Sequence, residues 1–123
     1  MIVLAPISVG ELIDKITILE LKLEYINIEQ KRINVLTEHI QLTSILDNID
    51  IPDISSLRKD LYNVNQELWH IENYKRLMER ENTFGDDFIN AARQVYLKND
   101  IRARIKRDIN ELVGSTIIEE KSY

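Results

Sequence analysis

The chain has 123 residues, of which 44% are hydrophobic, and a formal net charge of -5. This length and composition predict a single helical domain over residues 1–123, with one apolar core. The negative charge argues against nucleic acid or an anionic membrane surface as a partner. The absence of cysteine excludes disulfides and thiolate metal sites and favours a cytoplasmic location. Nothing in the composition indicates a cofactor, and no apolar stretch predicts a membrane span.

The first predicted helix begins at Ser8, because Ser8 and Glu11 have the spacing of a capping box. Its apolar residues recur in steps of four and three, which predicts one seam that packs against another helix. The seam residues are Leu12, Ile16, Leu19, Leu23 and Ile26. The helical pattern continues over residues 29–48. Between the two segments, Ile26-Asn27-Ile28 is either a kink or a turn, and we favour the turn.

A break at Pro52 precedes the third predicted helix, because proline has no backbone N–H to donate and the Asp, Asn and Ser residues around it favour turns and caps. This helix is expected to start at about Ser56 and to run towards Met78. Its apolar seam consists of Leu57, Leu61, Val64, Leu68 and Ile71.

Gly85 interrupts the pattern a second time, and Asp86 or Asp87 is expected to cap a fourth helix. That helix should end at Gly114, because glycine readily adopts the left-handed conformation that follows many helices. The chain is therefore predicted to be all-α: an antiparallel bundle of three to four helices. Its short apolar termini are expected to dock on the bundle or to form a minor β pairing.

Apolar residues outside the main seam of the first helix predict self-association. Ile13, Ile18 and Leu21 lie off that seam, and a four-helix monomer is not expected to cover them all. A homodimer with two-fold symmetry is the simplest assembly that would bury such a surface.

The fourth helix carries three cations on its apolar side. Lys98, Arg102 and Lys106 are spaced four residues apart and share a sector with Ile105 and Ile109, at about 100° per residue. A buried, unpaired charge costs several kcal/mol. Each cation is therefore expected to have a carboxylate, an anion or water as its partner.

Besides a place in a subunit interface, two interpretations of these cations remain open. In the first, their stems cover apolar surface and their heads reach water or close structural ion pairs with residues such as Glu72. In the second, helices one, three and four enclose a cationic pocket for a small anionic ligand. The candidate ligand-binding residues are Lys15, Lys22, Glu72, Tyr96, Asn99, Arg102, Lys106 and Asn110.

Four stretches of the chain carry a family resemblance: "PISVGELIDKITILELK", "ELWHIENYKR", "NDIRARIKRDINELVGS" and "IIEEKSY". Together they resemble domain-of-unknown-function family 6165, small bacterial and phage proteins that are sometimes found near surface-polysaccharide and glycosyltransferase functions. The resemblance brings no established activity and no catalytic residues.

The favoured function is a helical binding module with a cationic inter-helix pocket for a small anionic ligand. One alternative is a small all-α enzyme that rearranges an anionic metabolite by electrostatics, as chorismate mutases do. The other is a protein-interaction module that uses its helical faces and needs no pocket. A cation-rich cleft at Arg102 and Lys106 would separate the first two classes from the third.

Overall fold

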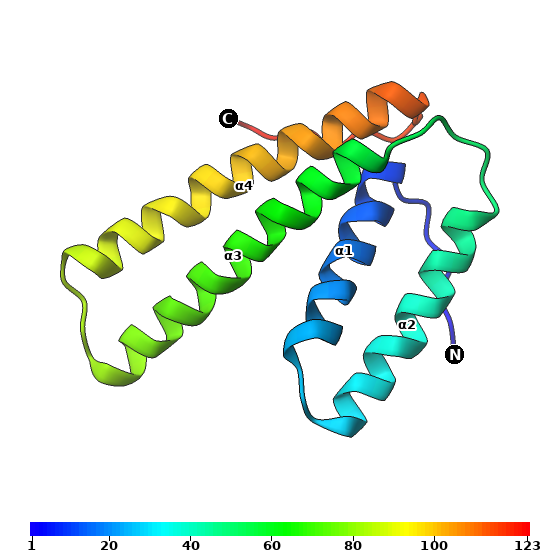
Figure 1. The fold of residues 1–123 in the computed structure, drawn as a ribbon. Helices are drawn as coiled ribbons and strands as arrows, with labels where there is room; N and C mark the ends of the chain where they lie inside the picture. Colours follow the sequence, from blue (N-terminus) through cyan, green and yellow to red (C-terminus); the bar gives the residue numbers. More distant parts are fainter.

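The computed structural model describes residues 1–123 and contains four helices and no strand (Figure 1). The helices are α1 (Val9–Tyr25), α2 (Glu29–Asp47), α3 (Ser55–Glu81) and α4 (Asp86–Val113). The all-α prediction is confirmed. The minor β pairing is not formed, because residues 1–7 and 115–123 have no regular secondary structure.

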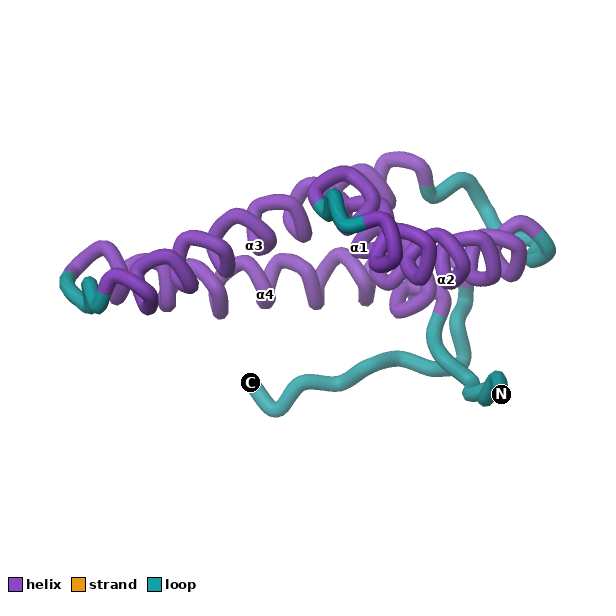
Figure 2. Tube along the Cα trace, turned by 90° about the horizontal axis from the view of Figure 1, so that it is seen from below, coloured by secondary structure: helices purple, strands orange, loops and turns teal.

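The helices form two antiparallel hairpins that meet at one end. The shorter hairpin is α1–α2 and the longer one is α3–α4, and Figure 1 shows that they diverge from the junction. At the junction α1 packs against all three other helices, whereas α2 packs only against α1. Figure 2 shows both chain ends on the same side of the helices, with the segment after α4 running back along that helix.

The turn between α1 and α2 is confirmed, with Ile26 in an extended conformation. An arginine holds this turn: Nη1 of Arg32 donates hydrogen bonds to the carbonyl oxygens of Leu23 and Ile26, the latter at 2.9 Å. A cation at the carbonyl end of a helix satisfies groups that have no partner within the helix. The contact closes the α1–α2 hairpin through the first turn of α2.

The other helix ends follow the breaks in the sequence closely. Pro52 lies in the loop between α2 and α3. Gly114 adopts the expected left-handed conformation, with φ 70°. At the start of α4 the prediction was wrong in detail, because Gly85 is the N-cap, while Asp86 and Asp87 lie in the first turn, where their charge favours the helix dipole. At the start of α1, Oγ of Ser8 accepts a hydrogen bond from the backbone N–H of Glu11 at 3.1 Å.

The core lies at the junction, where side chains of α1 pack against those of the neighbouring helices. It contains Leu12, Ile13, Ile16, Leu46, Ile54, Leu61, Val64 and Ile109. The predicted exposure of Ile13 and Leu21 was wrong: their exposed fractions are 0% and 1%. The reason is that α1 lies between α2 and the α3–α4 hairpin, so that neighbouring helices cover two of its sides.

One apolar surface that remains exposed lies on α2. Ile33, Leu36 and Ile40 are 50%, 47% and 59% exposed, and their spacing places them on one side of the helix. We call these three residues the α2 row. Because α2 packs only against α1, no other element of the chain covers this row. None of the four helices combines the length and the hydropathy that crossing a bilayer requires.

Candidate functional site

The most buried charge in the structure belongs to Asp14 on α1, which is 1% exposed. Arg102 on α4 binds it with two hydrogen bonds, from Nε to Oδ1 at 2.9 Å and from Nη2 to Oδ2 at 2.5 Å. Asn65 on α3 donates a third, from Nδ2 to Oδ1 at 2.9 Å. The Asp14 carboxylate raises the pKa of Arg102 above its ordinary value. This cluster links three helices through one carboxylate.

Arg102 therefore points between the helices, but its partner is Asp14 and not Glu72. Glu72 lies 3.6 Å from Lys75, one turn away on the same helix. Asp14 was not among the candidates because it lies off the apolar seam of the first helix, on a side that would face solvent if only one neighbour covered the helix. Enclosure of α1 on two sides turns that position into a buried one.

Lys106 is also buried, at 8% exposed, and has two carboxylate partners. Its Nζ donates to Oε2 of Glu11 at 2.6 Å and to Oε2 of Glu119 at 2.8 Å. Burial opposes the charge of Lys106, but these two hydrogen bonds outweigh it and raise the pKa above its ordinary value. Glu119 also contacts Lys121 at 2.7 Å. Hydrogen bonds from Lys106 and Lys121 lower the pKa of Glu119 to about 2.

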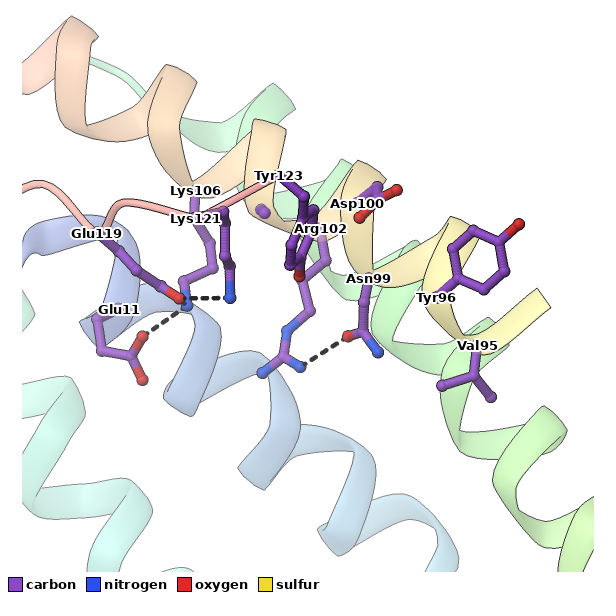
Figure 3. A pocket seen from close by; sticks show the side chains of 11 residues that line it. Glu11, Val95, Tyr96, Asn99, Asp100, Arg102, Lys106, Glu119, Lys121 and Tyr123 are labelled. Atoms are coloured by element: carbon purple, nitrogen blue, oxygen red, sulfur yellow. Dashed lines mark hydrogen bonds and ion pairs between the residues drawn. The ribbon is translucent and has the colours of Figure 1, made fainter. Parts of the chain in front are cut away.

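A cavity of about 950 Å³ lies between α4, the first turn of α1 and the tail, which we define as residues 115–123. Its lining residues are Glu11, Val95, Tyr96, Asn99, Asp100, Arg102, Ala103, Lys106, Glu119, Lys121 and Tyr123. Figure 3 shows the Lys106 and Lys121 cluster at one end and Val95 and Tyr96 at the other. Between the two ends, the Asn99 Oδ1 accepts a hydrogen bond from Arg102 Nη1 at 3.3 Å.

Four of the eight candidate residues line this cavity: Tyr96, Asn99, Arg102 and Lys106. The other four do not. Asn110, which is 2% exposed, accepts the backbone N–H of Gly10 at 2.7 Å and holds α1 against α4. Lys15 lies 3.5 Å from Glu11 on the exposed side of α1. Lys22 and Glu72 are not part of the lining.

Lys98, the third cation on the apolar side of α4, does not line this cavity. Its Nζ contacts Oε2 of Glu67 on α3 at 2.6 Å. Lys98 is therefore part of an α3–α4 ion pair, as the structural interpretation of the cation row expected.

Carboxylates balance the cations of the cavity. The lining includes the cations Arg102, Lys106 and Lys121 and the carboxylates Glu11, Asp100 and Glu119. The lining therefore has no excess positive charge, and Arg102 has its own buried partner in Asp14.

Sequence reasoning missed the contribution of the tail. Glu119, Lys121 and Tyr123 line the cavity, although all three lie beyond the last helix. Periodicity carries information only within regular elements, so it gives no signal for where such a segment returns. The charged run Glu119-Glu120-Lys121 was the available hint that the tail docks on a charged surface.

Comparison with protein-family models gives one match, a family of unknown function (DUF6165), over residues 3–123. The match spans essentially the whole chain, so the protein belongs to this family. Searches of curated proteins and of solved structures find no match for it.

Proposed function

We propose that this DUF6165 protein is a helical binding module, and that its cavity takes a small molecule with an anionic group and an apolar or aromatic body. The proposal rests on the difference between the two ends of the cavity, one of which is charged and the other apolar. Lys106 and Lys121 lie at one end together with the carboxylates of Glu11 and Glu119, and Val95 and Tyr96 form the other end.

The middle of the cavity offers groups that would orient such a ligand. Asn99 uses its side-chain oxygen to accept from Arg102, so its amide nitrogen can donate to a ligand. Tyr96 is 53% exposed and presents its ring at the apolar end. An aromatic ligand body beside that ring would gain stacking free energy.

We expect phenyl phosphate to bind more tightly than inorganic phosphate, by about three- to tenfold, because ring pairing contributes about 0.5–1.5 kcal/mol. Isothermal titration calorimetry at constant ionic strength measures both affinities. Tyr96→Ser should remove most of the difference while leaving the affinity for inorganic phosphate unchanged.

Tyr74→Ser provides the matched control, because Tyr74 is a 47% exposed tyrosine on α3 that does not line the cavity. It should preserve the preference for phenyl phosphate. Equal affinities for the two phosphates in the unmodified protein, or no binding of either, would contradict the proposal.

Binding is favoured over catalysis by how the cations are used. Electrostatic rearrangement of a dianion needs cationic donors aimed at the substrate. Arg102 directs Nε and Nη2 at Asp14, and Lys106 is shared by two carboxylates. The enzyme alternative therefore has less support than a binding module.

An interaction role for the α2 row is supported separately, and we propose that a second copy of the chain covers it. Residues 33–46 contain one formally charged side chain, Glu38, in a protein with 30% charged residues. Depletion of charge is typical of interface centres. An antiparallel pairing centred near Leu36 sets Ile33 of one copy against Ile40 of the other, so the row is complementary to itself.

Light scattering at micromolar concentration should therefore give twice the chain mass of 14.5 kDa. Leu36→Glu should reduce the mass to that of one chain, because it brings two like charges together at the centre of the pairing. Leu112→Glu is the matched control, since Leu112 is a 49% exposed leucine on α4. A mass of 14.5 kDa for the unmodified protein would rule out this assembly.

A further inference from the structure

The tail is attached to the helices mainly by charged side chains. Its one backbone hydrogen bond to a helix runs from the N–H of Ser115 to the carbonyl oxygen of Asn110 at 2.8 Å. Beyond that point two ion pairs join it to α4: Glu119 to Lys106 at 2.8 Å and Glu120 to Arg107 at 3.2 Å. The Glu120–Arg107 pair is exposed, and exposed ion pairs contribute little stability and are weakened by salt.

The two carboxylates that share Lys106 differ in how firmly they are held. Glu11 is fixed in the first turn of α1, and its side chain is 29% exposed. Glu119 belongs to the irregular tail, and its side chain is 42% exposed. If Glu119 left, Lys106 would keep one carboxylate while a donor position opened towards the cavity. Glu119 is therefore the partner that a ligand can replace.

We infer that Lys106 and Lys121 form the anion subsite of the cavity, and that Glu119 is its internal occupant, which an incoming phosphate or carboxylate replaces. The inference rests on the proposed binding function. The two ammonium groups bracket the Glu119 carboxylate, with Nζ of Lys106 at 2.8 Å from Oε2 and Nζ of Lys121 at 2.7 Å from Oε1 (Figure 3). A phosphate or carboxylate that replaces Glu119 can accept hydrogen bonds from the same two ammonium groups.

This arrangement makes the Glu119 carboxylate and the ligand competitors for the same two lysines. A ligand that binds only when Glu119 has left both lysines has an apparent affinity equal to its intrinsic affinity multiplied by the fraction of chains in that state. By linkage, ligand binding must displace Glu119 from the lysines to the same extent.

The test compares two neutral substitutions of neighbouring carboxylates by calorimetry with inorganic phosphate at constant ionic strength. Glu119→Gln removes the internal occupant and should raise the affinity by about three- to tenfold, because the phosphate no longer has to replace a carboxylate that is paired with both lysines. Glu120→Gln removes the same charge, but Glu120 contacts Arg107 and not Lys106. The phosphate affinity of this variant should therefore stay within about twofold of that of the unmodified protein. Thermal melts verify that both variants are folded.

A reciprocal measurement follows the tail itself. Backbone amide NMR signals of residues 117–123 should shift in a saturable way as phosphate is added to the unmodified protein, and chloride at matched ionic strength should not reproduce the shift. Equal phosphate affinity in the unmodified protein and in Glu119→Gln would overturn the inference and leave the binding function standing. Absence of binding by phosphate and phenyl phosphate in every variant would overturn both.

Discussion

Replacing Arg102 by alanine should lower the free energy of unfolding by about 3–5 kcal/mol, because removing one partner of a buried ion pair leaves the other charge uncompensated. The stranded charge is Asp14, which would keep only the hydrogen bond from Asn65. Urea unfolding of the variant measures the loss. Arg104→Ala is the matched control, because Arg104 is an exposed arginine on the same helix without an ion pair, and its loss should stay within about 0.5 kcal/mol.

Two further results would distinguish a structural Asp14–Arg102 ion pair from an anion-binding site at Arg102. Phosphate should not restore the stability of Arg102→Ala, because Asp14 lacks a cation and not an anion. Adding Asp14→Asn to Arg102→Ala should recover part of the loss, because it removes the stranded carboxylate. A loss for Arg102→Ala no larger than that for Arg104→Ala would contradict the structural role of the pair.

The second large effect is expected for Gly10→Ala, because α1 and α4 are in close contact there. An added Cβ would lie 2.5 Å from the backbone oxygen of Lys106 and 2.9 Å from Oδ1 of Asn110. A backbone atom cannot rotate away as a side chain can, so the helices must separate and strain the Gly10–Asn110 hydrogen bond. Overpacking of this kind lowers the free energy of unfolding by about 1–3 kcal/mol. The higher helix propensity of alanine raises it by only about 1 kcal/mol, so the net effect is a loss of stability.

Gly85→Ala is the matched control for this substitution, because nothing lies within 4 Å of the Cβ that it adds. Its thermal midpoint should remain close to that of the unmodified protein. If Gly10→Ala were instead more stable than the unmodified protein, as helix propensity alone would favour, the close contact between α1 and α4 would be contradicted.

Periodicity and chain breaks predicted most of the fold. The helices α1, α3 and α4 follow the 3.6-residue apolar pattern, and Pro52, Gly85 and Gly114 mark loops or caps. What the sequence could not give was how the helices pair, since an apolar seam does not specify which helix covers it. The position of α1 between α2 and the α3–α4 hairpin buries Ile13, which the single-seam interpretation left exposed.

The candidate site was predicted on one helix and missed on the others. Arg102 and Lys106 do point between helices, because the apolar sector of α4 faces α1. Their partners Asp14 and Glu119 come from positions 88 and 13 residues away in the chain. Such contacts depend on tertiary packing and on the path of an irregular segment, and neither leaves a periodic trace in the sequence.

A crystal structure of the protein with phenyl phosphate tests the central claim most directly, because it locates the anion, the ring and the tail in one experiment. We expect the phosphate between Nζ of Lys106 and Nζ of Lys121, the ring beside Tyr96, and Glu119 moved away from Lys106. A phosphate bound elsewhere on the surface, with Glu119 still in contact with Lys106, would contradict the account.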